Sequence, residues 1–134
     1  MPAILRECDL IKTYKILHID DSPSMLYGVR KTIEKMGHDC MIVQNPLDAI
    51  EKALDYQPNL ILINLLMPEM NGIQLCGKMN KTESLKNIPK YICSVGYGHS
   101  PEEEMKMYAK RRGAVDFHNS LLTEDILKKW IDLL

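Results

Sequence analysis

Two adjacent carboxylates, Asp20 and Asp21, have the clearest chemical potential in this sequence of 134 residues. They follow the apolar run YKILHI directly, so we expect them just beyond the end of a strand. Neighbouring carboxylates repel each other unless a cation neutralises them, and carboxylate oxygens are preferred ligands of hard divalent cations. The pair therefore indicates a cation site. The alternative is that Asp21 only forms a turn or caps a helix.

A second informative stretch runs from Leu60 to Gly72, with the sequence LILINLLMPEMNG. Its apolar run ends at Asn64 and predicts a buried strand, while Pro68 and Gly72 mark a tight loop before a helix. In open parallel α/β sheets, functional side chains lie just outside the carboxyl ends of the strands. Asn64 stands at such an end and offers a neutral amide oxygen to a cation. The alternative is that Asn64 caps the loop by hydrogen bonds.

Strand-like and helix-like segments alternate five times along the chain. Short connections between such elements imply a parallel sheet with right-handed crossovers and helices on both faces. The sequence therefore predicts an α/β fold of the flavodoxin-like, doubly wound (βα)5 type, with strand order 2-1-3-4-5. The predicted strands are Tyr14 to Asp20, Cys40 to Val43, Leu60 to Asn64, Tyr91 to Val95 and Val115 to His118.

Most of the predicted helices begin at residues that suit a helix N-terminus. Ser22 is a good N-cap and Pro23 a good first helical residue. The second helix is predicted to begin at Asn45-Pro46 and to bury one apolar face. We expect that face to consist of Leu47, Ile50 and Leu54. We expect the other helices to run from Gly72 to Asn80, from Ser100 to Arg112 and from Thr123 to Leu134.

The length of the chain suits one domain with a buried core. We assign residues 14–134 to this domain and residues 1–13 to an N-terminal extension. The net charge of -1 does not favour binding to nucleic acid or to an anionic membrane. No apolar run is long enough to span a bilayer, and the first residues lack the pattern of a signal peptide.

The four cysteines are scattered and show no CxxC spacing, so we expect reduced thiols and no disulfide or zinc site. Together with the missing signal peptide, this favours a cytoplasmic location. His18 lies within an apolar strand and is predicted to be a hydrogen-bonded core residue.

From Tyr14 to Leu134 the chain resembles the receiver domains of response regulators, the CheY-like family. IDDSPSM resembles the acidic pair of that family, and NLLMPEMNG resembles its phosphoacceptor segment. GAVDF fits the Gly-Ala-x-Asp-aromatic pattern of the last strand. The resemblance implies a protein of two-component signal transduction with no enzymatic activity of its own.

Two positions depart from the family pattern. The family's phosphoacceptor aspartate, which takes its phosphoryl group from a histidine kinase, is replaced by Asn64, and the family's Lys-Pro pair is replaced by Ser120 and Leu121. Losing one carboxylate and one ammonium together leaves the formal charge of the pocket unchanged. Phosphoryl transfer needs a nucleophile and cationic stabilisation of the developing charge. The resemblance therefore implies a pseudo-receiver that is not phosphorylated at the usual position.

Two alternatives remain from the sequence. The first is a phosphorylation-dependent response regulator in which Asn64 is an engineered inactivating substitution, and Ser120 and Leu121 count against it. The second is an enzyme on the same scaffold, for which the sequence offers no evident pair of nucleophile and base.

The resemblance also assigns roles to individual residues. It implies a weak Mg²⁺ site at Asp20 and Asp21 with Asn64, and no other cofactor. Ser94 and Phe117 take the positions of the family's switch residues, although a phenylalanine in a strand is also a typical core residue. Without the proline, we expect a trans peptide in the loop of residues 119–121.

The family uses its fourth helix, fifth strand and fifth helix to bind partners and to dimerise. The expected partners are signalling proteins, such as a histidine kinase or an output protein, or a second copy of the chain; nucleic acid and membranes are not expected. The basic run that ends the fourth helix also complements the dipole of that helix. The residues predicted for this face are Tyr97, Met105, Tyr108, Lys110, Arg111, Arg112 and Phe117.

Overall fold

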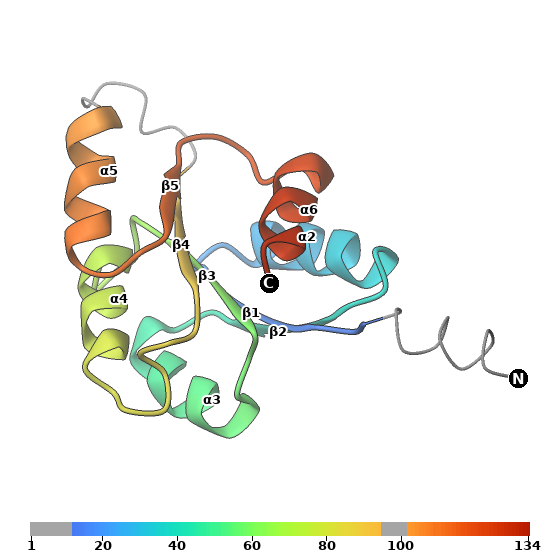
Figure 1. The fold of residues 1–134 in the computed structure, drawn as a ribbon, viewed down its shortest axis with the longest axis horizontal. Helices are drawn as coiled ribbons and strands as arrows, with labels where there is room; N and C mark the ends of the chain where they lie inside the picture. The colour runs from blue at the N-terminus through green and yellow to red at the C-terminus, as the bar shows by residue number, and fades with distance from the viewer. Residues whose placement is uncertain (1–11, 95–101) are drawn as a thin grey trace, which may run out of the picture.

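A five-stranded parallel sheet with the strand order β2-β1-β3-β4-β5 forms the centre of the molecule (Figure 1). The structure, a computed structural model, describes residues 12–94 and 102–134. The order confirms the predicted flavodoxin-like fold. The strands are β1 (Lys15–Ile19), β2 (Asp39–Val43), β3 (Leu60–Asn64), β4 (Lys90–Cys93) and β5 (Asp116–His118).

Helices cover both faces of the sheet (Figure 1). Because successive side chains of a strand point to opposite faces, Leu60 and Leu62 pack on one side of β3 while Ile61 and Ile63 pack on the other. The first side is covered by α2 (Pro23–Lys35) and α6 (Glu124–Asp132), and the second by η1 (Pro46–Asp48), α3 (Ala49–Tyr56), α4 (Gly72–Asn80) and α5 (Glu102–Arg111).

The predicted helix starts follow from side-chain capping. The Met25 backbone N–H donates to Ser22 Oγ at 3.4 Å, with Pro23 as the first helical residue. The side chains of Asn71 and Gln74 form a reciprocal capping box at α4. The bounds of β3 and α4 are those predicted from the sequence.

The predicted apolar face of the second helix was wrong in two of its three residues. Leu47 is 57% exposed and Leu54 is 41% exposed, whereas Ala49 and Ala53 are fully buried. Pro46–Asp48 form a 3-10 turn, α3 begins only at Ala49, and the stripe of α3 that packs in the core contains Ala49 and Ala53. The small alanine side chains face the core in place of the two leucines.

Some sequence predictions lie outside the described residues: the end of the fourth strand at Val95, and the helix start at Ser100 and Pro101. Within the described part of the chain, none of the helices combines the length and apolar character needed to cross a bilayer.

Candidate functional site

The carboxyl ends of three neighbouring strands bring the predicted site residues together. Asp20 follows β1, Asn64 ends β3, and Ser94 follows β4. With Asp21 they line an open hollow of about 210 Å³. Ser94 is 2% exposed, and its backbone N–H donates to the His118 carbonyl oxygen at 2.9 Å. The residues predicted from separate motifs therefore share one site.

The amide group of Asn64 bridges two oxygen atoms. Its Nδ2 donates to the Leu66 carbonyl oxygen at 2.8 Å and to Asp21 Oδ1 at 3.3 Å. The opposite amide orientation would place two oxygen atoms 2.8 Å apart at Leu66, with no hydrogen between them. Asn64 therefore directs its nitrogen at Asp21.

Asp20 and His18 form a buried pair beneath the hollow. Asp20 is 5% exposed, and its Oδ1 accepts from the Ser22 backbone N–H at 3.0 Å. Burial, with a smaller contribution from the Asp21 charge, raises the pKa of Asp20 to about 6. His18 Nε2 lies 3.8 Å from Asp20 Oδ2, and burial lowers the pKa of His18 to about 4.

His18 is a core residue, as predicted, but it is not fully hydrogen-bonded. Its Nδ1 is buried and has no hydrogen-bond partner among the described residues. The sequence prediction was wrong on this point, because the neighbouring strand positions supply apolar side chains.

The ligands at this site do not match a three-carboxylate magnesium site. Asp20 is engaged by Ser22 and lies beside His18, and the third position presents an N–H donor in place of a carboxylate oxygen. Among the described residues there is no group of three or more His, Cys, Asp or Glu side chains placed to hold a metal. The site therefore consists of two carboxylates, Asp20 and Asp21, each of which accepts a hydrogen bond from another residue of the protein.

We predict that Asp20→Asn stabilises the protein at neutral pH. The pKa of Asp20 is about 6 in the folded protein, whereas the ordinary value is 3.8. The carboxyl group therefore contributes its full stability below about pH 3.8, and this contribution is lost as the pH rises through about 6. The asparagine avoids the loss and keeps the oxygen that accepts from Ser22. Urea unfolding should show a gain of roughly 2–3 kcal/mol at about pH 7.5 that nearly vanishes at about pH 4.

The exposed Asp55→Asn on α3 is the matched control and should change stability by less than about 0.5 kcal/mol at either pH. An equal gain for Asp20→Asn at both pH values would show that titration of Asp20 is not its cause.

The loop after β5 directs Ser120 away from Asn64. Ser120 Oγ lies 2.8 Å from His118 Nε2, and Ser120 does not line the hollow. His118 Nε2 also lies 3.2 Å from the Leu121 carbonyl oxygen. A carbonyl only accepts, so this contact favours a hydrogen on Nε2, which then does not act as a base toward Ser120. No cis peptide bond occurs in the described residues, so this loop is trans, as expected.

Aromatic rings pack behind this loop. The Trp130 ring stacks on Tyr91 with centroids 4.2 Å apart, and His118 meets Trp130 edge-on at 5.9 Å. Phe117, at the switch position, is 3% exposed and belongs to the core on the other side of the sheet. Its ring is therefore not available as part of an exposed contact surface.

The other residues predicted for the contact face have different environments. Met105 is half-buried against the core, whereas Tyr108 is 44% exposed on α5. Arg111 and Arg112 line a pocket shared with α4. Tyr97 lies outside the described residues. The structure therefore does not bring all of these side chains to one surface.

Sequence reasoning missed a buried lysine at the start of β4. Lys90 is 1% exposed, and burial lowers its pKa. Its Nζ donates to Asn80 Oδ1 at 2.7 Å, to the Leu85 carbonyl oxygen at 2.6 Å and to the Ile88 carbonyl oxygen at 2.8 Å. The only signal in the sequence was a charged residue at the edge of the apolar run KYIC.

The sequence comparison identifies the class of protein: residues 16–130 match the response regulator receiver domain family, to which the chain belongs. It is similar to the protein PilH of Pseudomonas aeruginosa, with 30% identity over 118 residues, 88% of this chain and 94% of PilH. Protein PilG of the same organism is 25% identical over 115 residues, 86% of this chain and 79% of PilG.

Solved structures show the same fold. The chemotaxis protein CheY4 of Vibrio cholerae superposes with a TM-score of 0.80 at 23% identity, covering 92% of this chain and all of that one. The signal receiver domain of a histidine kinase from Syntrophus aciditrophicus gives a TM-score of 0.77 at 25% identity, covering 90% of this chain and 89% of that one.

Proposed function

We propose that this receiver domain acts in two-component signalling by binding protein partners, without aspartyl phosphorylation. The observation that carries the proposal is Asn64, which takes the phosphoacceptor position at the end of β3. An amide lacks the anionic oxygen with which a carboxylate attacks phosphorus. The position of the family's lysine holds Ser120, whose hydroxyl contacts His118. The nucleophile and the cation are both missing.

The bridging amide supports a site that keeps its shape without a phosphoryl group. Asn64 joins Asp21 to the Leu66 carbonyl through N–H donors, so two oxygens that would attract a cation are already hydrogen-bonded. Receiver domains typically bind Mg²⁺. In this chain we propose that Asp20 and Asp21 bind it only weakly, because the ion would compete with these hydrogen bonds.

The proposed contact face comprises α5, β5 and α6. Large apolar side chains are exposed on α5 and next to β5: Met107 at 53%, Tyr108 at 44%, Val115 at 45% and Leu121 at 56%. Such side chains favour burial against another protein. The proposed partner is a signalling protein, either a histidine kinase or an output protein, and a second copy of the chain is the alternative.

We propose a reducing, cytoplasmic environment for this function. Cys40, Cys76 and Cys93 are free thiols, and burial raises the pKa of Cys76 to about 11. A thiol with a raised pKa is protonated and unreactive at neutral pH, as expected for a structural cysteine.

Intact-mass spectrometry tests the absence of phosphorylation. After incubation with Mg²⁺ and a small phosphodonor, the protein should gain no phosphoryl group. The variant Asn64→Asp should also gain none, because Ser120 leaves the developing charge without a cation. A receiver domain known to be phosphorylated, treated in parallel, shows that the donor is active.

The two variants separate the possible results. A stoichiometric adduct on the unaltered chain would overturn the proposal, and mapping it would identify the acceptor. An adduct on Asn64→Asp alone would favour the alternative of a phosphorylation-dependent regulator with an inactivating asparagine.

A further inference from the structure

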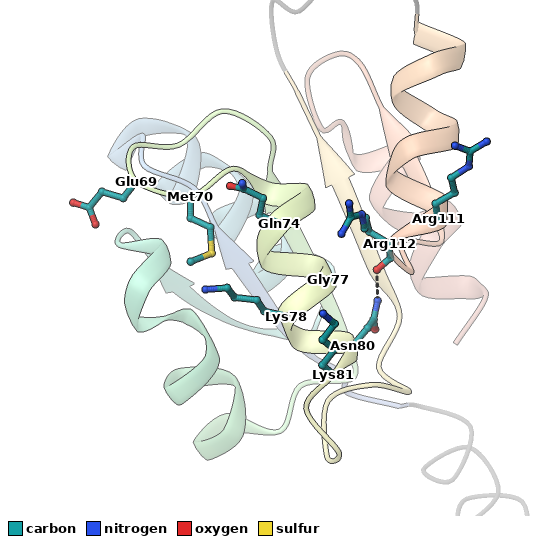
Figure 2. Close-up of a pocket in the computed structure, with 9 residues that line it drawn as sticks. All are labelled: Glu69, Met70, Gln74, Gly77, Lys78, Asn80, Lys81, Arg111 and Arg112. Carbon is teal, nitrogen blue, oxygen red and sulfur yellow. Dashed lines mark hydrogen bonds between the residues drawn. The ribbon is translucent and has the colours of Figure 1, made fainter.

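A basic groove lies between α4 and the end of α5, away from the hollow at Asn64. Its volume is about 730 Å³ (Figure 2). We name it for its four cationic side chains, Lys78, Lys81, Arg111 and Arg112; among the described residues, Glu69 is the only acidic side chain that lines it. Figure 2 shows Arg112 extending between the two helices and Lys78 extending toward Met70 on the other side of α4. The positive charges are therefore spread across the width of the groove.

The positive charge of the groove exceeds what the two helix ends require. Four cations and one carboxylate give a formal charge of +3, from four minus one. The C-termini of α4 and α5 each contribute roughly half a negative charge, or about one in total. A surplus of about two positive charges remains on a chain whose net charge is -1. The dipoles of the helices therefore do not account for the whole cluster.

No ion pair neutralises these cations within the part of the chain that the structure describes. Ion pairs elsewhere in that part join Lys86 with Glu83 and Lys128 with Asp132. Arg112 instead stacks on Tyr108, with the guanidinium carbon 5.3 Å from the ring centroid. A Cβ at Gly77 would lie 3.8 Å from its Cδ, an ordinary van der Waals distance, so the Arg112 side chain lies close against α4. Arg112 is therefore held in place while its charge stays available.

The two walls of the groove are fixed to each other. Asn80 Nδ2 donates to the Arg112 carbonyl oxygen at 2.7 Å (Figure 2). The Oδ1 of the same side chain accepts from the buried Lys90 at 2.7 Å. A site held in its binding geometry loses less conformational entropy when a ligand binds.

We propose that the basic groove binds an acidic segment of a partner protein. The dispersed charges suit a chain that carries several carboxylates better than one compact anion. Small-molecule sites are mostly apolar, whereas Met70 is the only large apolar side chain that lines this groove. None of the described residues that line it is aromatic, so this lining offers no stacking surface of the kind that single-stranded nucleic acid uses.

This inference goes beyond the proposed function. The groove shares the end of α5 with the proposed contact face, but binding there does not require β5, α6 or any property of Asn64. Its test uses other variants than the phosphorylation test, and either can fail alone.

The test measures binding of fluorescein-labelled octaglutamate to the full chain by fluorescence anisotropy at low ionic strength. The triple variant Lys78→Gln/Lys81→Gln/Arg111→Gln should weaken binding at least about tenfold. The matched variant Lys31→Gln/Lys35→Gln/Lys52→Gln removes three exposed charges from α2 and α3 and should weaken it less than about twofold. In the NMR spectrum, octaglutamate should shift the amide signals of Gly77, Lys78 and Arg112.

Four results would overturn the inference: no binding of octaglutamate, equal weakening by both triple variants, amide shifts confined to other elements, or weakening only by a groove variant that has lost its native NMR spectrum. Tighter binding of a single-stranded oligonucleotide of equal charge would replace it with a nucleic-acid site. If inorganic phosphate at the same concentration of charge displaced octaglutamate, the groove would instead be a site for small anions.

Discussion

Replacing Lys90 with methionine should lower the free energy of unfolding by about 3 kcal/mol. The methionine fills the space of the lysine stem but cannot donate to the three oxygens that the ammonium contacts. Each buried acceptor left without a partner costs roughly 1–3 kcal/mol, and the sum is partly offset because the ammonium no longer has to be desolvated. The loss remains large, since two of the acceptors are backbone carbonyls that the substitution leaves in place.

Urea unfolding followed by circular dichroism measures this effect. Lys86→Met is the matched control, because Lys86 lies in the same loop region but is exposed and pairs only with Glu83, at 3.1 Å. It should change stability by less than about 0.5 kcal/mol. If the two variants were equally stable, the three contacts of Lys90 would contribute nothing net, and the interpretation of this residue would be wrong.

Gly72→Ala should destabilise the protein by about 3 kcal/mol, although alanine favours helices more than glycine does. A Cβ at Gly72 would lie 2.2 Å from the Asn64 carbonyl oxygen and 2.9 Å from its carbonyl carbon. These are backbone atoms at the end of a central strand, so β3 or α4 has to move. The glycine that follows Met67-Pro68 is therefore required by close packing between the start of α4 and Asn64.

Gly28→Ala provides a control of opposite sign. Gly28 lies inside α2, and a Cβ there would meet no atom within 4 Å. Alanine at this position should stabilise the protein by about 0.5–1 kcal/mol, from helix propensity alone. Both variants can be compared by thermal and urea unfolding. A stabilised Gly72→Ala would show that α4 can withdraw from Asn64 without cost.

The fold could be predicted because it follows from short-range patterns. The apolar run that ends at Asn64 and the cap at Asn71 lie close together in the sequence, and they set the bounds of β3 and α4. The buried face of α3 was not predictable in this way. It depends on which stripe of the helix packs against the sheet, and Ala49 and Ala53 belong to that stripe.

The site could be predicted as a set of residues but not as a set of contacts. Asp20, Asp21, Asn64 and Ser94 follow three adjacent strands, so topology alone brings them together. The direction of the Asn64 amide depends on the position of the Leu66 carbonyl, which no sequence pattern specifies.

Contacts between distant segments were also out of reach of the sequence. Lys90 has three acceptors because the chain between Asn80 and Ile88 folds around its ammonium. The basic groove combines Lys78 of α4 with Arg112, which follows α5, and the Asn80 side chain links the two segments through the Arg112 carbonyl.

The aromatic cluster behind β5 gives the molecule an optical probe of its own. Trp130 is the only tryptophan in the chain, so the tryptophan fluorescence of the protein comes from one known position. Its indole lies on Tyr91 and meets the edge of His118, whose other contacts are Ser120 and the Leu121 carbonyl. Any ligand that reorders the loop after β5 changes the surroundings of this fluorophore. Events at that end of the molecule can therefore be followed in real time without attaching a dye.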